Sequence, residues 1–101
     1  MPIRGKLYRF TNTNISNAPT DIGVYALYER GELIYIGRGE SKGGIRSRLQ
    51  SHKRGDEGRC TQRATSYRRE RSSDPLTREI YLQEEFLDRY GRLPRCNDRV
   101  G

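Results

Sequence analysis

The chain has 101 residues, of which 32% are hydrophobic and 33% are charged, and its formal net charge is +7 at pH 7. This length suits one domain with a modest core and is too short for two. No run is apolar enough to cross a membrane, and residues 1–6 lack the apolar centre of a signal peptide. We therefore expect a single cytoplasmic domain over residues 1–101.

Arginine accounts for 17 of the 20 basic residues. The planar guanidinium offers a fork of donors that matches phosphate, so this bias favours a nucleic-acid partner over the alternative of a solvated basic surface. In a reducing compartment Cys60 and Cys96 are expected to be free thiols. Together with His52 they have no paired spacing and do not indicate a zinc site.

The first predicted strand covers residues 6–10, where polar and apolar side chains alternate, and residues 11–21 read as a polar loop. A hairpin follows. Its strands, residues 23–28 and 33–37, are rich in β-branched and aromatic residues.

A three-residue loop over 29–31 would place Tyr25 directly opposite Tyr35. A two-residue Arg30-Gly31 turn would put the two tyrosines on opposite faces. With the longer loop, side-chain alternation predicts two faces. The first holds Tyr25, Leu27, Leu33 and Tyr35, and the second holds Val24, Ala26, Ile34 and Ile36 and should pack on helices.

Residues 38–44 are basic and glycine-rich, without the spacing of a dinucleotide-binding loop. A helix is predicted from about Gly44 to Lys53, closed by Gly55. Arg48 and His52 are four residues apart and therefore project from the same side of this helix.

Residues 59–71 carry several arginines around Tyr67, which fits a track for phosphates with an aromatic contact. A helix with a solvated basic face is the competing interpretation. The last helix is predicted over Pro75 to Tyr90, with Asp74 as N-cap and Gly91 after its end.

The stretch Gly23-Val24-Tyr25, Tyr35-Ile36-Gly37, Arg48 and His52 resembles the signature of the GIY-YIG nuclease superfamily, with valine for the first isoleucine. The ending Pro94 to Asn97 resembles the family's Pro-x-x-Asn close. The resemblance implies an α/β (α+β) domain with a small antiparallel sheet of about three strands flanked by helices. It also implies a divalent-metal-dependent DNA endonuclease that uses Mg²⁺ or Mn²⁺.

In that family a glutamate on a helix after the signature holds the metal, and the candidates here are Glu79, Glu84 and Glu85. Glu84 is preferred because Ile80, Tyr81 and Leu87 should place it at the edge of the buried stripe. Spacing from Asn97 favours Glu85, and an apolar repeat that begins at Glu79 keeps that residue open.

The resemblance also implies roles. Tyr25 would activate water, with His52 as a possible relay, while Tyr35 would position water or phosphate. Arg48 would bind the scissile phosphate, with Arg46 as its rival, and Asn97 would brace the site. The predicted nucleic-acid contacts are Arg38, Lys42, Arg46, Lys53, Arg63, Arg68, Arg69 and Asn97.

Two other functions remain open from the sequence. One is a non-catalytic basic module that binds nucleic acid with the same fold. The other is a small basic protein that binds an acidic protein partner. A chain of this length has no evident second DNA-reading domain, so a protein partner could supply specificity to a nuclease.

Overall fold

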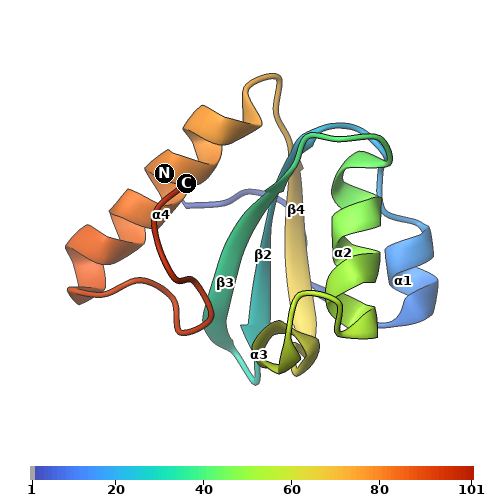
Figure 1. The fold of residues 1–101 in the computed structure, drawn as a ribbon, viewed down its shortest axis with the longest axis horizontal. Helices are drawn as coiled ribbons and strands as arrows, with labels where there is room; N and C mark the ends of the chain where they lie inside the picture. The colour runs from blue at the N-terminus through green and yellow to red at the C-terminus, as the bar shows by residue number, and fades with distance from the viewer. Residues whose placement is uncertain (1) are drawn as a thin grey trace.

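A four-stranded antiparallel sheet with strand order β1-β4-β2-β3 forms the centre of the computed structural model, which describes residues 2–101 (Figure 1). The predicted α+β class with an antiparallel sheet is confirmed, but the sheet has four strands instead of about three. The strands are β1 (Tyr8–Arg9), β2 (Gly23–Glu29), β3 (Glu32–Gly39) and β4 (Ser66–Arg71).

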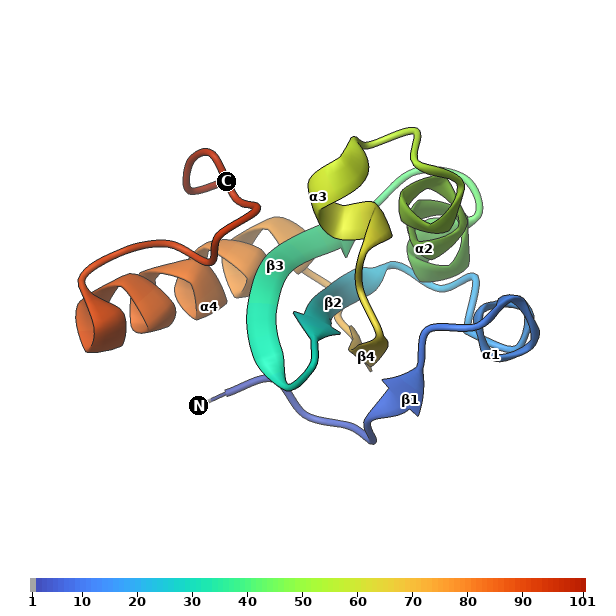
Figure 2. The same cartoon turned by 90° about the horizontal axis from the view of Figure 1, so that it is seen from below.

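Helices cover both faces of this sheet. Figures 1 and 2 show α4 along one face and α1 with α2 along the other, while α3 lies beside α2. The helices are α1 (Asn12–Ser16), α2 (Gly44–Arg54), α3 (Arg59–Gln62) and α4 (Pro75–Tyr90). No helix within residues 2–101 is long and apolar enough to cross a membrane.

Each face of the sheet has its own core. The larger cluster joins Tyr25 and Leu27 of β2 to Ile45 and Leu49 of α2, all of which are buried. The smaller one lies under α4 and is built around Val24, Ile36 and Leu82. The sheet is therefore buried on both sides, although only about a third of the residues are hydrophobic.

No strand was predicted in the arginine-rich segment, but residues 66–71 form β4, which lies between β1 and β2. Tyr67 is its one fully buried side chain. The arginines lie over rings of neighbouring strands, with Arg68 5.8 Å from the ring centre of Tyr28 and Arg69 4.5 Å from that of Tyr8. Their aliphatic stems cover the sheet while the charged ends stay near water.

Residues 12–16 also differ from the prediction, because they form helix α1 inside the expected loop. The Thr11 hydroxyl accepts a hydrogen bond from the Asn14 amide at 3.2 Å, which caps the helix. Ile15 is buried in the larger core, so this short helix is held mainly by packing.

The hairpin uses the two-residue turn and not the predicted three-residue loop. Glu29 pairs with Glu32, and Arg30 and Gly31 both have positive φ, 50° and 87°. Positive φ at both positions defines a type I′ turn, whose twist matches that of the flanking strands.

A register shift between Leu27 and Tyr28 then inserts one extra residue into β3, so Leu27 pairs with Tyr35 and Tyr25 with Gly37. Because this shift restores the alternation, Tyr25 and Tyr35 share a face as diagonal neighbours instead of direct partners. It also exchanges two predicted positions. Ile34 packs with Tyr25, and Leu33 packs with Val24.

The bounds of the two long helices agree closely with those predicted from the sequence. Helix α2 ends one residue later than predicted, at a left-handed Gly55, and α4 has the predicted bounds. Asp74 accepts a hydrogen bond from the Thr77 amide at 3.3 Å, and Gly91 closes the helix with φ 72°. Capping residues therefore marked both boundaries correctly.

The prediction of free thiols is wrong. Cys60 and Cys96 form a disulfide with Cα atoms 5.7 Å apart, and it connects α3 to the C-terminal segment. Neither cysteine has a close partner in sequence, since 36 residues separate them. The fold alone brings them together.

Candidate active site

Tyr25, His52 and Thr61 form a buried chain of hydrogen bonds between β2, α2 and α3. The Tyr25 phenol oxygen is 2.7 Å from His52 Nε2, and His52 Nδ1 is 2.8 Å from the Thr61 hydroxyl. Tyr25 and His52 have no exposed surface. The α-helical spacing of Arg48 and His52 brings both side chains to this place, as predicted.

The charges of this chain are determined by its burial. Burial, followed by the nearby charge of Arg48, lowers the pKa of His52 to about 3, so the imidazole is neutral at pH 7. Burial also raises the pKa of Tyr25 well above its ordinary value, and the neighbouring Tyr35 adds to this effect while Arg48 opposes it. Tyr25 is therefore a protonated phenol without contact to solvent. The predicted role as the group that activates water does not fit it.

Tyr35 and Arg48 are the parts of the cluster that reach the surface. The Tyr35 ring lies 4.9 Å from the His52 ring and 6.1 Å from the Tyr25 ring. The side chain of Arg48 is 34% exposed, and its Nη2 lies 3.5 Å from Glu57. Its buried Nε has no hydrogen-bond partner within residues 2–101. An anion from solvent could therefore engage only the exposed part of the Arg48 side chain, because Nε is enclosed within the protein.

The glycines of the two aromatic motifs are required for close packing. A Cβ atom at Gly37 would lie 2.6 Å from the Tyr25 phenol oxygen and 2.6 Å from the Tyr35 ring. At Gly23 it would lie 2.3 Å from the carbonyl oxygen of Glu70 in β4. Gly37 therefore allows both tyrosines to cross over β3.

Arg46 and Arg48, the two candidates for the phosphate-binding arginine, lie in different places. Arg46 Nε donates to the carbonyl oxygen of Ala18 at 2.7 Å, which attaches α2 to the loop before β2. Arg48 instead lies next to the phenols of Tyr25 and Tyr35 and affects the pKa of each. Of the two, Arg48 is the arginine that lies beside the two motif tyrosines.

Glu79, and not Glu84, is the glutamate of α4 that lies near the cluster. Glu79 is 4% exposed and forms an ion pair with Arg38 of β3. Burial raises the pKa of Tyr35, the charge of Arg48 opposes this rise, and the charge of Glu79 adds to it. Glu84 is exposed on the outer side of α4, which contradicts the inward orientation expected for it, and Glu85 lines a cavity elsewhere.

Near the cluster, Glu79 is the carboxylate that could contribute one ligand to a hydrated divalent cation. Mg²⁺ commonly binds through one or two carboxylates and completes its coordination with water and substrate phosphate. Glu79 could provide such a ligand, although Arg38 now balances its charge. Burial raises the pKa of Glu79 despite this ion pair. Within residues 2–101 no group of three or more histidine, cysteine, aspartate or glutamate side chains is placed to hold a metal ion.

Asn97, which the resemblance implies would brace the site, bonds to the backbone of Ile36 in the Tyr35-Ile36-Gly37 motif. Its side chain accepts a hydrogen bond from the Ile36 amide at 2.9 Å and donates one to the Ile36 carbonyl at 3.0 Å. Gln83 of α4 donates to the same carbonyl at 3.0 Å. Both amide atoms of Asn97 are thus engaged within the protein, and its predicted contact with nucleic acid is not supported.

The other predicted nucleic-acid contacts are dispersed. Lys42 and Arg63 are exposed, while the Lys53 ammonium lies 5.3 Å from the Phe10 ring centre. Because side chains alternate in a strand, Arg68 and Arg69 point to opposite faces of β4. Arg68 also donates to the carbonyl oxygen of Gly5 at 2.6 Å. Residues 59–71 therefore do not form one continuous track.

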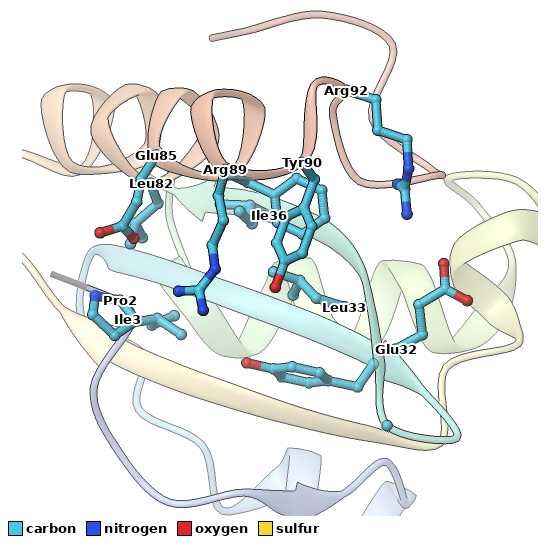
Figure 3. Close-up of a pocket in the computed structure, with 13 residues that line it drawn as sticks. Pro2, Ile3, Glu32, Leu33, Ile36, Leu82, Glu85, Arg89, Tyr90 and Arg92 are labelled. Atoms are coloured by element: carbon cyan, nitrogen blue, oxygen red, sulfur yellow. The ribbon is translucent and has the colours of Figure 1, made fainter.

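A separate cavity of about 450 Å³ lies under the C-terminal half of α4, on the sheet face opposite Tyr25 and Tyr35 (Figure 3). Leu33, Ile36 and Leu82 line its apolar part. Arg89 and Tyr90 extend into it from the helix, as Figure 3 shows. None of the residues predicted for catalysis lines this cavity.

Sequence reasoning missed Thr61, Gln83 and Glu57. Thr61 is separated from the motif residues in sequence and gave no signal. Gln83 follows Glu79 by four residues, so the helical spacing could have shown that the two share a face. Glu57 lies in the short connection between α2 and α3, and its contact with Arg48 depends on how that connection folds.

No protein-family model matches the chain, and no curated protein matches it either. The resemblance to GIY-YIG nucleases therefore rests on the sequence motifs alone.

Proposed function

We propose that this chain is a divalent-metal-dependent DNA endonuclease of the GIY-YIG type. The observation that carries the proposal is the position of Arg48, whose partly exposed side chain lies beside the phenols of the buried Tyr25 and the half-buried Tyr35. An anion-binding arginine beside a protonated phenol suits a phosphodiester, whose cleavage develops negative charge on oxygen.

In this proposal the side chains have distinct roles. Arg48 binds the scissile phosphate, and Tyr35, which burial keeps protonated, donates a hydrogen bond to a phosphate oxygen. The buried Tyr25 and His52 pack against Tyr35 and help to fix the positions of Tyr35 and Arg48. A cation at Glu79 would supply positive charge that polarises the phosphate and makes water a better nucleophile. Arg38, released from Glu79, would still donate to Glu40 through Nε at 2.7 Å and could contact a second phosphate with its other donors.

The alternative function is a non-catalytic nucleic-acid-binding module of the same fold. It is favoured by a specific observation, because Tyr25 and His52 are buried and both are poor proton acceptors at neutral pH. The net charge of +7 supports nucleic-acid binding in either case.

The test is incubation of the pure protein with supercoiled, linear, branched and single-stranded DNA in magnesium, manganese or EDTA. We expect cleavage that EDTA abolishes and that Arg48→Leu reduces by at least about a hundredfold. Binding without cleavage in every metal would leave the binding module. If binding is also absent across a salt series, an acidic protein becomes the better candidate partner.

A further inference from the structure

The Cys60–Cys96 disulfide lies next to one support of the buried hydrogen-bond chain. Cys60 belongs to the short helix α3 and directly precedes Thr61. The Thr61 hydroxyl is 2.8 Å from His52 Nδ1 and is the last member of that chain. Whatever holds α3 in place therefore also holds the partner of His52.

The other cysteine, Cys96, lies next to the residue whose side chain holds β3 in place. Cys96 directly precedes Asn97, whose side chain bonds the amide and the carbonyl of Ile36. The Cys96 backbone amide also donates to the carbonyl oxygen of Ile34 at 2.8 Å. One covalent bond thus connects the segments that support the site at α2 and at β3.

The two cysteine residues differ in exposure. Cys60 lies within the exposed residues 56–60, whereas Cys96 is half-buried and packs against the larger core. Figure 2 shows α3 at the periphery of the molecule, beside α2. A thiol in solution can therefore approach the sulfur of Cys60 more readily than that of Cys96.

We propose that this disulfide is a site of thiol exchange, at which a dithiol protein attacks Cys60 and so releases both supports. A thiolate of the dithiol bonds to Cys60 Sγ, the bond between the two cysteine sulfurs breaks, and Cys96 leaves as a thiolate that takes up a proton. The second thiol of the reductant then displaces Cys60. The reductant becomes a disulfide, two electrons pass to the chain, and both cysteines become thiols.

Reduction makes the segments that support the site more mobile but does not unfold the protein. Without the covalent link, α3 and residues 94–97 are held only by non-covalent contacts, so the Ile36 amide loses its acceptor for part of the time. The central strand β2 lies between β3 and β4 and keeps its partners. This inference does not depend on the proposed nuclease function.

The experiment is amide hydrogen exchange followed by NMR, on the oxidised chain and on the chain reduced by thioredoxin. We expect exchange at Ile36 to become at least tenfold faster after reduction, while the amides of Tyr25 and Ala26 change by less than twofold. Unchanged exchange at Ile36 overturns the proposal. So does uniform acceleration at every amide, because the disulfide would then be a structural link needed for the fold.

Two variants complete the test. The double variant Cys60→Ser with Cys96→Ser should show the reduced pattern with or without thioredoxin. Asn97→Ala, with the disulfide intact, should also accelerate exchange at Ile36, since the acceptor of that amide is removed. If it does not, or if thioredoxin reduces only the denatured chain, the proposal fails.

Discussion

The phenol oxygen of Tyr25 and Nε2 of His52 are 2.7 Å apart, and both side chains are completely buried. This pair connects the central strand to α2 and leaves only Tyr35 and Arg48 of the cluster near solvent. The two motif tyrosines are therefore different in kind, although the sequence presents them as equivalents.

Replacement of the two tyrosines should separate these roles. Tyr25→Phe leaves His52 Nε2 without its partner, so we expect the free energy of unfolding to fall by about 1–3 kcal/mol and cleavage to stay within tenfold. Tyr35→Phe should reduce cleavage by at least about a hundredfold, with little loss of stability. Urea unfolding and single-turnover cleavage measure the two effects. Equal loss of cleavage in both variants would mean that the buried phenol takes part in the chemistry.

The metal ligand can be tested with a matched pair on one helix. Glu79→Gln should abolish magnesium-supported cleavage, because an amide is a much weaker ligand for a hard cation. Glu84→Gln, on the exposed side of the same helix, should cleave at the parental rate. Cleavage assays over a magnesium series measure both variants. An inactive Glu84→Gln with an active Glu79→Gln would contradict the assignment.

Stability should depend on pH through His52, the only histidine of the chain. Its pKa is about 3 in the folded protein, whereas an unfolded histidine takes up a proton below about pH 6.5. The unfolded state therefore binds more protons in this range. We expect the free energy of unfolding to fall by about 1.4 kcal/mol per pH unit as the pH drops below about 6.

The control for this prediction is His52→Gln, which keeps polar atoms at the position but does not titrate. Urea unfolding measured from pH 7 to pH 5 should show that the free energy of unfolding depends less steeply on pH in the variant. An identical slope in both proteins would show that folded His52 titrates normally.

The hairpin turn offers a stabilising substitution. Arg30 has φ 50°, which costs energy for most residues and less for asparagine. Asn-Gly is the preferred pair for a type I′ turn, so Arg30→Asn should raise the free energy of unfolding by about 0.5–1 kcal/mol. Urea unfolding checks this. A loss of stability would show that the exposed Arg30 side chain stabilises the fold by more than its positive φ costs.

The sequence predicted the elements that local chemistry determines. Asp74, Pro75 and Gly91 marked the last helix correctly because capping and φ preferences act within a few residues. The hairpin was visible for the same reason. Its register was not, because the extra residue in β3 depends on how both faces of the sheet pack and not on the turn alone.

The strand β4 and the choice of glutamate depended on tertiary contacts. Ser66 to Arg71 contains one large apolar residue, so a strand inside the sheet had no hydrophobic signal. On α4 the inward positions include the polar Glu79 and Gln83, which are buried because Arg38 and Ile36 satisfy them. The apolar residues beside Glu84 therefore predicted the wrong orientation for that side chain.

The outer edge of β3 has a further consequence for the behaviour of the protein in solution. An uncovered edge strand exposes a row of amides and carbonyls to which another chain can add. Here residues 94–97 occupy that row at Ile34 and Ile36, and at the opposite edge β1 has only two residues. The C-terminal segment thus protects the molecules from edge-to-edge association and aggregation.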